Sequence, residues 1–353
     1  MGDISDDGGD PPRRTSVTLR YTRRTIVLLV GALTLYFVMP SVLEVFSAWD
    51  EVSTLGWGWL TLTVACQTAS FGCIWALQRL ALRTSSWEPV ITSQLAGNAA
   101  SRVIPGGGAT GATVQFSLLR SAGIDAAPAA SGLAAVSILQ LGTTLALPVV
   151  ALPGILLGAP VDSNLVHAAW LGAAIFVALF ALVVVALVRD GPLRVMGNSV
   201  GWLRNTVVRR GRRWSATGER FIAERNSAIG ELGDRWRIAL ALAVGRSLFD
   251  YLTLLVALRA VGAEPRVSLV LLAYAAGSLL TLIPITPGGL GFVEAGLTGT
   301  LALAGIGASA AVSASLLYRL ASFWLPIPVG LVAGVTHGVR YRRANGNGGS
   351  AKD

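Results

Sequence analysis

The sequence predicts an all-α protein that crosses a membrane several times. Hydrophobic residues make up 53% of its 353 residues and charged residues only 13%, a balance that soluble domains of this size do not show. The apolar residues gather in stretches long enough to cross about 30 Å of hydrocarbon at about 1.5 Å per residue. Two further apolar stretches are interrupted by proline and glycine. We therefore expect about six full transmembrane helices and two broken, re-entrant hairpins, with eight transmembrane helices as the alternative.

Hydropathy divides the chain into two membrane halves joined by a polar linker. The six full spans are expected at 25–46, 56–82, 124–148, 164–189, 237–259 and 309–337, and the broken hairpins at 90–119 and 267–304. This gives a disordered tail over 1–24, a first half over 25–189, a linker over 190–236, a second half over 237–339 and a tail over 340–353.

The two breaks carry the strongest local signals. Their residues are Pro105, Gly106 and Gly107 in the first hairpin and Pro287, Gly288 and Gly289 in the second. Proline lacks a backbone N–H and glycine weakens a helix, so the helix must stop at both places. Such a break at membrane depth is tolerated only inside protein or beside a wet cavity. A half-helix starting there would direct unpaired N–H groups towards an anion; alternatively, the glycines only permit close packing.

Arginine placement predicts the orientation. Eleven arginines lie between Arg189 and Arg237, against five acidic residues, and others cluster in the tails and near 79–89. Because basic loops stay in the cytoplasm, both termini are expected there. The linker, which also has apolar residues at helical spacing, either lies on the inner membrane surface or is a solvated tether.

An internal repeat relates the two halves. A shift of 182 residues, the difference between 287 and 105, superimposes the two breaks and the spans on either side of them. Under the predicted orientation the two copies enter the membrane from opposite sides, which is the inverted-repeat plan of many secondary transporters. Chance alignment within an Ala-, Gly- and Leu-rich sequence is the alternative.

Few ionisable residues lie inside the predicted spans. They are Arg102, Arg246, Asp250, Glu294 and Arg319, with Asn98, Tyr318 and several glutamines as polar neighbours. Each charge costs roughly 2.5 to 3.5 kcal/mol if it faces lipid alone, so each should find a partner inside the protein. Arg246 and Asp250 are four residues apart and can pair on one helix face. Glu294 and Arg319 either bind substrate or form a structural ion pair.

Other kinds of site have no support in the sequence. Gly106, Gly107 and Gly108 do not form a nucleotide loop, since no strand precedes them and no Lys-Ser/Thr follows. His167 and His337 lie far apart, and Cys66 and Cys73 are expected to pack as small hydrophobic residues. We therefore expect no metal, no cofactor, no nucleic acid and no catalytic constellation.

The second break and the following span carry a resemblance. The run Pro287-Gly288-Gly289-Leu290-Gly291 with Glu294-Ala295, followed by Tyr318-Arg319 and Ser322-Phe323-Trp324, resembles the signature of the lysylphosphatidylglycerol synthase transmembrane family, also called the flippase-like domain family. The similarity extends from about Arg24 to Arg340. In the family's multiple peptide resistance factors this membrane domain precedes an aminoacyl-transferase domain, which we expect to be absent here.

The resemblance implies a lipid transporter of the bacterial cytoplasmic membrane. A phospholipid or lipid-linked headgroup would be held by Arg102, Arg319 and the half-helix N-termini, while Glu294 would bind a cationic moiety or act as a proton-coupled gate. The alternatives are a membrane-embedded enzyme that modifies a lipid, and a scaffold that positions a separate cytoplasmic enzyme through the basic linker. The identity of the lipid, the energy source and the oligomeric state stay open.

Overall fold

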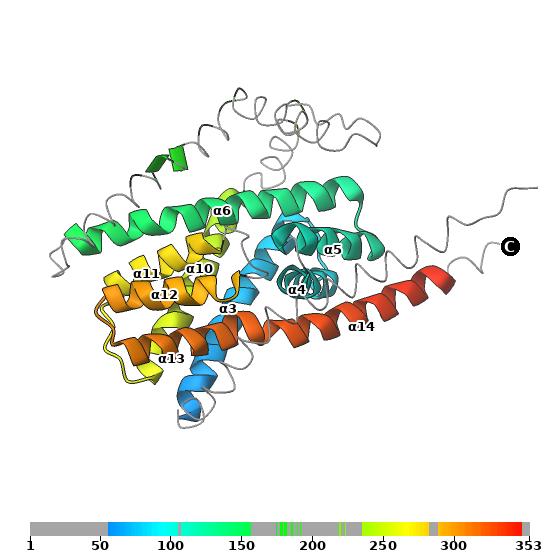
Figure 1. The fold of residues 1–353 in the computed structure, drawn as a ribbon. Coiled ribbons are helices and arrows are strands. Elements are labelled where there is room, and N and C mark those ends of the chain that lie inside the picture. Colours follow the sequence, from blue (N-terminus) through cyan, green and yellow to red (C-terminus); the bar gives the residue numbers. More distant parts are fainter. Residues whose placement is uncertain are drawn as a thin grey trace, which may run out of the picture.

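The described part of the protein is helical. The computed structural model describes residues 56–104, 107–156, 235–281 and 289–347, with isolated positions between 174 and 223. Within those ranges every regular element is a helix, as Figure 1 shows. The spans expected at 25–46 and 164–189, the N-terminal tail and nearly all of the basic linker lie outside the described residues.

Four stretches of the described chain are long and apolar enough to cross a membrane. Three are single helices: α3 (Trp57–Ala81), α6 (Ala126–Leu156) and α10 (Trp236–Ala260). The fourth consists of α13 (Ala308–Arg319), the π-helical η3 (Leu320–Trp324) and α14 (Pro326–Asn347). These stretches coincide with the spans expected at 56–82, 124–148, 237–259 and 309–337. The chain is therefore an all-α polytopic membrane protein.

Two of these helices are longer than the spans predicted from hydropathy. The spans are expected at 124–148 and 309–337, whereas α6 continues to Leu156 and α14 continues to Asn347. Hydropathy marks where apolar residues stop, whereas a helix continues as long as its backbone hydrogen bonds are satisfied.

The first broken stretch is a pair of short helices, α4 (Glu88–Val103) and α5 (Gly107–Ser121). They approach closely at Gly97 and Gly111, since a Cβ added to Gly97 would lie 2.8 Å from the Gly111 carbonyl oxygen. The start of α4 and the end of α5 share one apolar cluster with the end of α3 and the start of α6, formed by Leu82, Val90, Leu119 and Ala129. Both outer ends of this hairpin therefore lie at the same end of the bundle.

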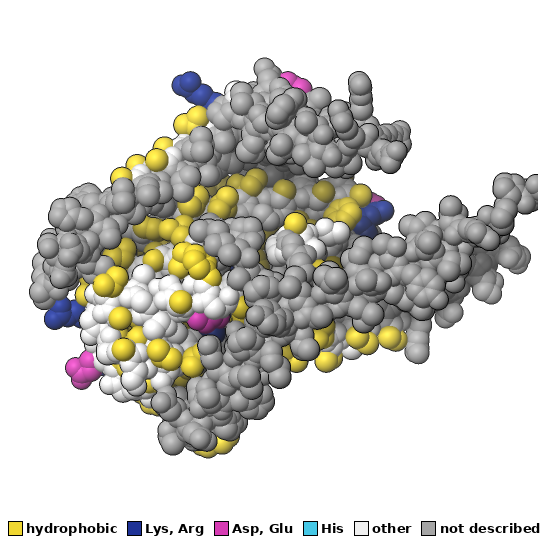
Figure 2. Space-filling model, in the orientation of Figure 1, with side chains coloured by type: hydrophobic (Ala, Val, Ile, Leu, Met, Phe, Trp, Pro, Cys, Tyr) yellow, Lys and Arg dark blue, Asp and Glu magenta, His cyan; other side chains and the backbone are white. Residues whose placement is uncertain are grey.

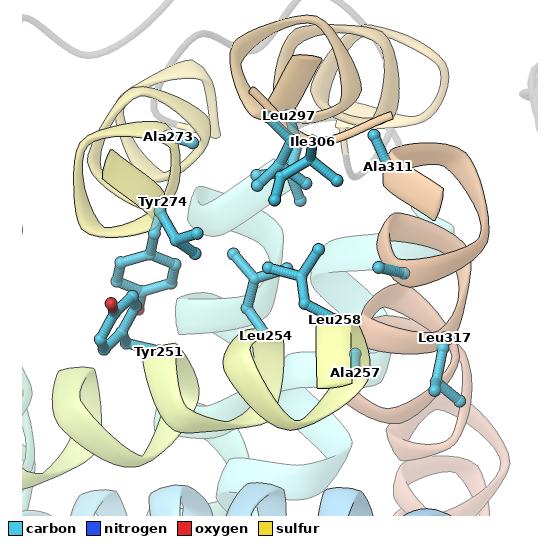
Figure 3. Close-up of a cluster of buried hydrophobic side chains, with 13 residues drawn as sticks. Tyr251, Leu254, Ala257, Leu258, Ala273, Tyr274, Leu297, Ile306, Ala311 and Leu317 are labelled. Atoms are coloured by element: carbon cyan, nitrogen blue, oxygen red, sulfur yellow. The ribbon is translucent and has the colours of Figure 1, made fainter. Parts of the chain in front are cut away.

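The second broken stretch has the same plan at the opposite end. Here α11 (Val267–Leu280) packs against α12 (Phe292–Leu303). Val270 near the start of α11 and Leu301 near the end of α12 belong to one apolar cluster with the end of α10 and the start of α13. Figure 3 shows this cluster, including Leu258 and Ala311. The half-helix α12 begins at Phe292 and not directly after the Pro-Gly-Gly run, which ends at Gly289. The delay arises because Gly289 and Gly291 have φ of +71° and +76°, which a right-handed helix excludes.

The two halves pack with opposite directions. Helices α3 and α10, which the predicted repeat equates, run antiparallel: Ser70 Oγ donates to the Arg246 carbonyl oxygen at 3.0 Å, and Ala81 packs with Ala239. The predicted repeat also equates α4 with α11, and α6 with the last long stretch, α13 to α14. In the structure α4 packs on α14, and α11 packs on α6. The outer ends of the two hairpins therefore lie at opposite ends of the bundle.

Candidate functional site

The last long helix changes its hydrogen-bonding pattern inside the bundle. In η3 the Leu325 N–H donates to the Leu320 carbonyl oxygen at 2.8 Å, five residues back. Pro326 and Pro328 explain the change, because neither has an N–H to donate to a carbonyl group in the preceding turn. Single π turns within α-helices occur frequently at functional sites. This turn lies between α13, which packs on α10 and α12, and α14, which packs on α4 and α5.

A buried ion pair joins this helix to the second hairpin. Arg319 Nε donates to Glu294 Oε1 at 2.6 Å, and the two side chains are 6% and 12% exposed. Glu294 lies in the first turn of α12, after Gly291 at the N-cap, where the helix dipole favours a carboxylate. Glu294 Oε2 is buried and has no hydrogen-bond partner. The inner end of the second hairpin therefore carries a carboxylate that is only partly satisfied.

Arg102 reaches the same helix from the first hairpin. It lies in the last turn of α4 and donates Nη1–H to the Phe323 carbonyl oxygen. The guanidinium carbon of Arg102 is 4.7 Å from the centroid of the Phe323 ring, and that of Arg319 is 4.2 Å from the same centroid. Cation–π contacts of this kind stabilise a charge that has left water. The Phe323 ring therefore contacts both Arg102 of the first hairpin and Arg319 of α13.

Asp250 has different partners from those expected. Tyr274 and Tyr318 both donate their hydroxyl hydrogens to Asp250 Oδ2, at 2.9 Å and 2.8 Å. An ion pair with Arg246 is not among those that the described residues form.

Together these contacts define a central charged cluster. Its members are Arg102, Asp250, Glu294, Tyr318, Arg319 and Phe323. Figure 2 shows acidic and basic side-chain atoms lying together on the face where α12 meets α13. Arg246 lies on the same helix as Asp250, one turn earlier. Of the helix-break residues, Gly107 and Gly289 are described, whereas Pro105, Gly106, Pro287 and Gly288 lie outside the described residues.

Several uncharged polar side chains are buried inside the bundle. Asn98 lies one turn before Arg102 on α4, and its Oδ1 is buried without a hydrogen-bond partner. Gln67 Oε1 and Gln140 Nε2 are in the same condition. Other amides tie helices together: Trp75 donates to Gln94, and Gln115 donates to Gln78. Sequence reasoning identified most of these amides but not Tyr274 or the role of Phe323, because nothing local marks a residue as a partner of a distant charge.

His337 anchors the first hairpin to the last helix. Its ring nitrogens lie 2.7 Å from Thr92 Oγ1 and 3.0 Å from the Leu118 carbonyl oxygen, so it contacts both α4 and α5. Nearby, Arg340 pairs with Glu88 at 2.8 Å. The sequence singled out His337 only as a histidine far from any other. Across the described residues, no three His, Cys, Asp or Glu side chains are grouped to hold a metal.

This architecture defines a class of multi-pass membrane protein in which two broken hairpins meet a charged last helix. The model of the family described as the lysylphosphatidylglycerol synthase TM region matches residues 24–330. The chain belongs to that family. A UPF0104 membrane protein of Methanothermobacter thermautotrophicus is 38% identical over 101 residues, a stretch that covers 29% of this chain and 29% of that relative. The chain thus aligns with less than a third of its curated relative's length.

Proposed function

We propose that this protein moves a phospholipid, or a lipid-linked headgroup, between the two leaflets of a membrane. The observation that carries the proposal is the meeting of both hairpins at one charged cluster. Arg102 lies at the inner end of the first hairpin and Glu294 at the inner end of the second, and the two hairpins start from opposite ends of the bundle. A headgroup at this cluster could be reached from either end by movement of one hairpin.

The chemistry of the cluster fits a headgroup that carries a phosphate. Two arginines provide charge-assisted donors, and Glu294 can accept from a cationic or hydroxyl group. Such charges are expensive at membrane depth and mark substrate pathways in many transporters. In this mechanism the Glu294–Arg319 pair is closed when the site is empty and opens when a headgroup competes for its members. The membrane partners would therefore be lipids with an anionic headgroup.

We propose an orientation of the protein in the membrane together with this function. The antiparallel packing of α3 and α10 agrees with a basic linker and both termini in the cytoplasm. The first hairpin would then open towards the cytoplasm and the second towards the outside. For a bacterial protein this membrane would be the cytoplasmic one.

Proteoliposomes test this function directly. Purified protein is reconstituted with phospholipids that carry a fluorescent headgroup or acyl chain, and a membrane-impermeant quencher reports the fraction in the outer leaflet over time. We expect the wild type to redistribute at least one anionic lipid class, and Glu294→Gln to slow it at least tenfold. Release of a chemically altered lipid would instead favour an enzyme. Dependence on an added cytoplasmic protein would favour a scaffold.

A further inference from the structure

The two arginines of the central charged cluster have unequal partners. Arg319 is neutralised by Glu294 at 2.6 Å and makes further contacts. The hydrogen-bond partner of the Arg102 side chain within the described helices is the carbonyl group of Phe323, which is neutral. A carboxylate or phosphate oxygen is a stronger acceptor for a guanidinium than an amide carbonyl. Binding of an anion is therefore more favourable at Arg102 than at Arg319, where the anion must first displace the Glu294 carboxylate.

The local sequence removes one donor that the carbonyl contacted by Arg102 could otherwise use. In a π-helical pattern Phe323 would receive the N–H of residue 328, which is a proline and has none. Backbone groups freed by proline at membrane depth are satisfied by neighbouring helices, and here Arg102 of α4 supplies the donor. While the site is empty, this contact gives the guanidinium a hydrogen-bond acceptor and gives the carbonyl a donor.

We propose that Arg102 is the primary phosphate-binding residue and that the Phe323 carbonyl occupies its place until a headgroup arrives. This inference rests on the proposed function and assigns separate roles to the two arginines. Phosphate binding exchanges the carbonyl for a phosphate oxygen and so releases α4 from the π turn of the last helix. The planar guanidinium, which rests on the Phe323 ring, presents a fork of N–H donors that matches a phosphate. Asn98 Oδ1, one turn earlier, is buried without a hydrogen-bond partner and would accept from a headgroup donor.

The test measures binding separately from transport. Full-length protein in phosphate-free detergent is titrated with dihexanoyl phosphatidylglycerol, and dihexanoyl glycerol serves as the ligand without phosphate. We expect Arg102→Gln to weaken binding at least tenfold and Arg102→Lys to weaken it less, because lysine keeps the charge but not the fork. The double variant Glu294→Gln, Arg319→Gln keeps Arg102 and should lose less affinity than Arg102→Gln, since a phosphate at Arg319 must first displace the Glu294 carboxylate.

Arg120→Gln is the matched control, because Arg120 lies on the same hairpin at its outer end, where it is exposed beside Asp125. A second readout uses ¹⁵N-labelled arginine in frozen samples, where a ¹⁵N–³¹P dipolar coupling should appear with ligand in the wild type and vanish in Arg102→Lys. Equal binding by wild type and Arg102→Gln, or equal losses in Arg102→Gln and the Glu294, Arg319 double variant, would overturn the assignment. Redistribution of lipid in proteoliposomes despite that result would leave the proposed function standing. Absence of both binding and redistribution in the wild type would overturn both.

Discussion

Each buried charge of the central cluster is stabilised by a different kind of partner. Glu294 has an arginine, Asp250 has two tyrosine hydroxyls, and Arg102 has a backbone carbonyl and an aromatic ring. Only the first of these could be anticipated from the family signature. The helical spacing of Arg246 and Asp250 predicted an ion pair, but the folded protein brings Tyr274 and Tyr318 to Asp250 from other helices. Sequence spacing describes one helix and does not contain these tertiary partners.

Removing one member of the Glu294–Arg319 pair should destabilise the protein strongly. Arg319→Leu leaves the Glu294 carboxylate buried without its arginine, and Glu294→Leu removes the carboxylate that pairs with Arg319, so we expect each to lower the free energy of unfolding by about 3 to 5 kcal/mol. The double Leu variant should recover most of that loss, because both charges of the pair are gone. Chemical or SDS denaturation in detergent measures these differences. Single variants as stable as the wild type would show that the pair does not persist in the native state.

Each tyrosine that is hydrogen-bonded to Asp250 should contribute measurably to the free energy of unfolding. Tyr274→Phe and Tyr318→Phe each delete one hydrogen bond to a carboxylate, with an expected loss of about 1.5 to 3 kcal/mol. Both hydroxyls use the same oxygen, so a double-mutant cycle should give a coupling energy above about 0.5 kcal/mol. Tyr251→Phe is the control, because that hydroxyl donates to the Val267 carbonyl oxygen and not to Asp250. Additive effects of the two variants would contradict a shared acceptor.

Close packing of helices is the dominant feature at the element scale. Within the described residues, the sequence predicted where four spans and the two pairs of short helices lie, because hydropathy and the Pro-Gly runs are local signals. It did not predict the π turn, although Pro326 and Pro328 lie beside it, or the contact between Arg102 and Phe323, which are 221 residues apart. Glycines also have unequal roles: Gly330 lies directly against α4, whereas Gly338 on the same helix has open space around it.

Gly330→Ala should separate α14 from α4. An added Cβ would overlap the Leu95 carbonyl oxygen and approach the Ala99 side chain, so we expect destabilisation by about 1 to 3 kcal/mol despite the better helix propensity of alanine. Gly338→Ala is the matched control and should be neutral or stabilising, because nothing lies within 4 Å of its added Cβ. Thermal unfolding of the purified variants compares them. Equal stability of the two variants would argue against close contact at Gly330.

At the scale of the whole molecule, the two halves are joined along α3 and α10. A Cβ at position 245 would lie 3.2 Å from Cys73 Sγ, which suits a disulfide. Gly245→Cys should therefore crosslink to Cys73 on mild oxidation. A protease site inserted in the linker near residue 210 would then yield halves that separate only under reducing conditions. Cys73→Ser in the same background is the control. Halves that separate without reductant would contradict the antiparallel packing of α3 on α10.

The central claim is that two hairpins, entering from opposite ends, deliver one shared site to both faces of the membrane. The most direct measurement places Cys at Asn98, beside Arg102, with Cys66 and Cys73 changed to Ser. A membrane-impermeant thiol reagent is then applied separately to right-side-out and inside-out vesicles. We expect labelling from both sides, with protection by dihexanoyl phosphatidylglycerol in each. Labelling from one side only, or from neither, would contradict alternating exposure and leave the cluster as a structural joint between the hairpins.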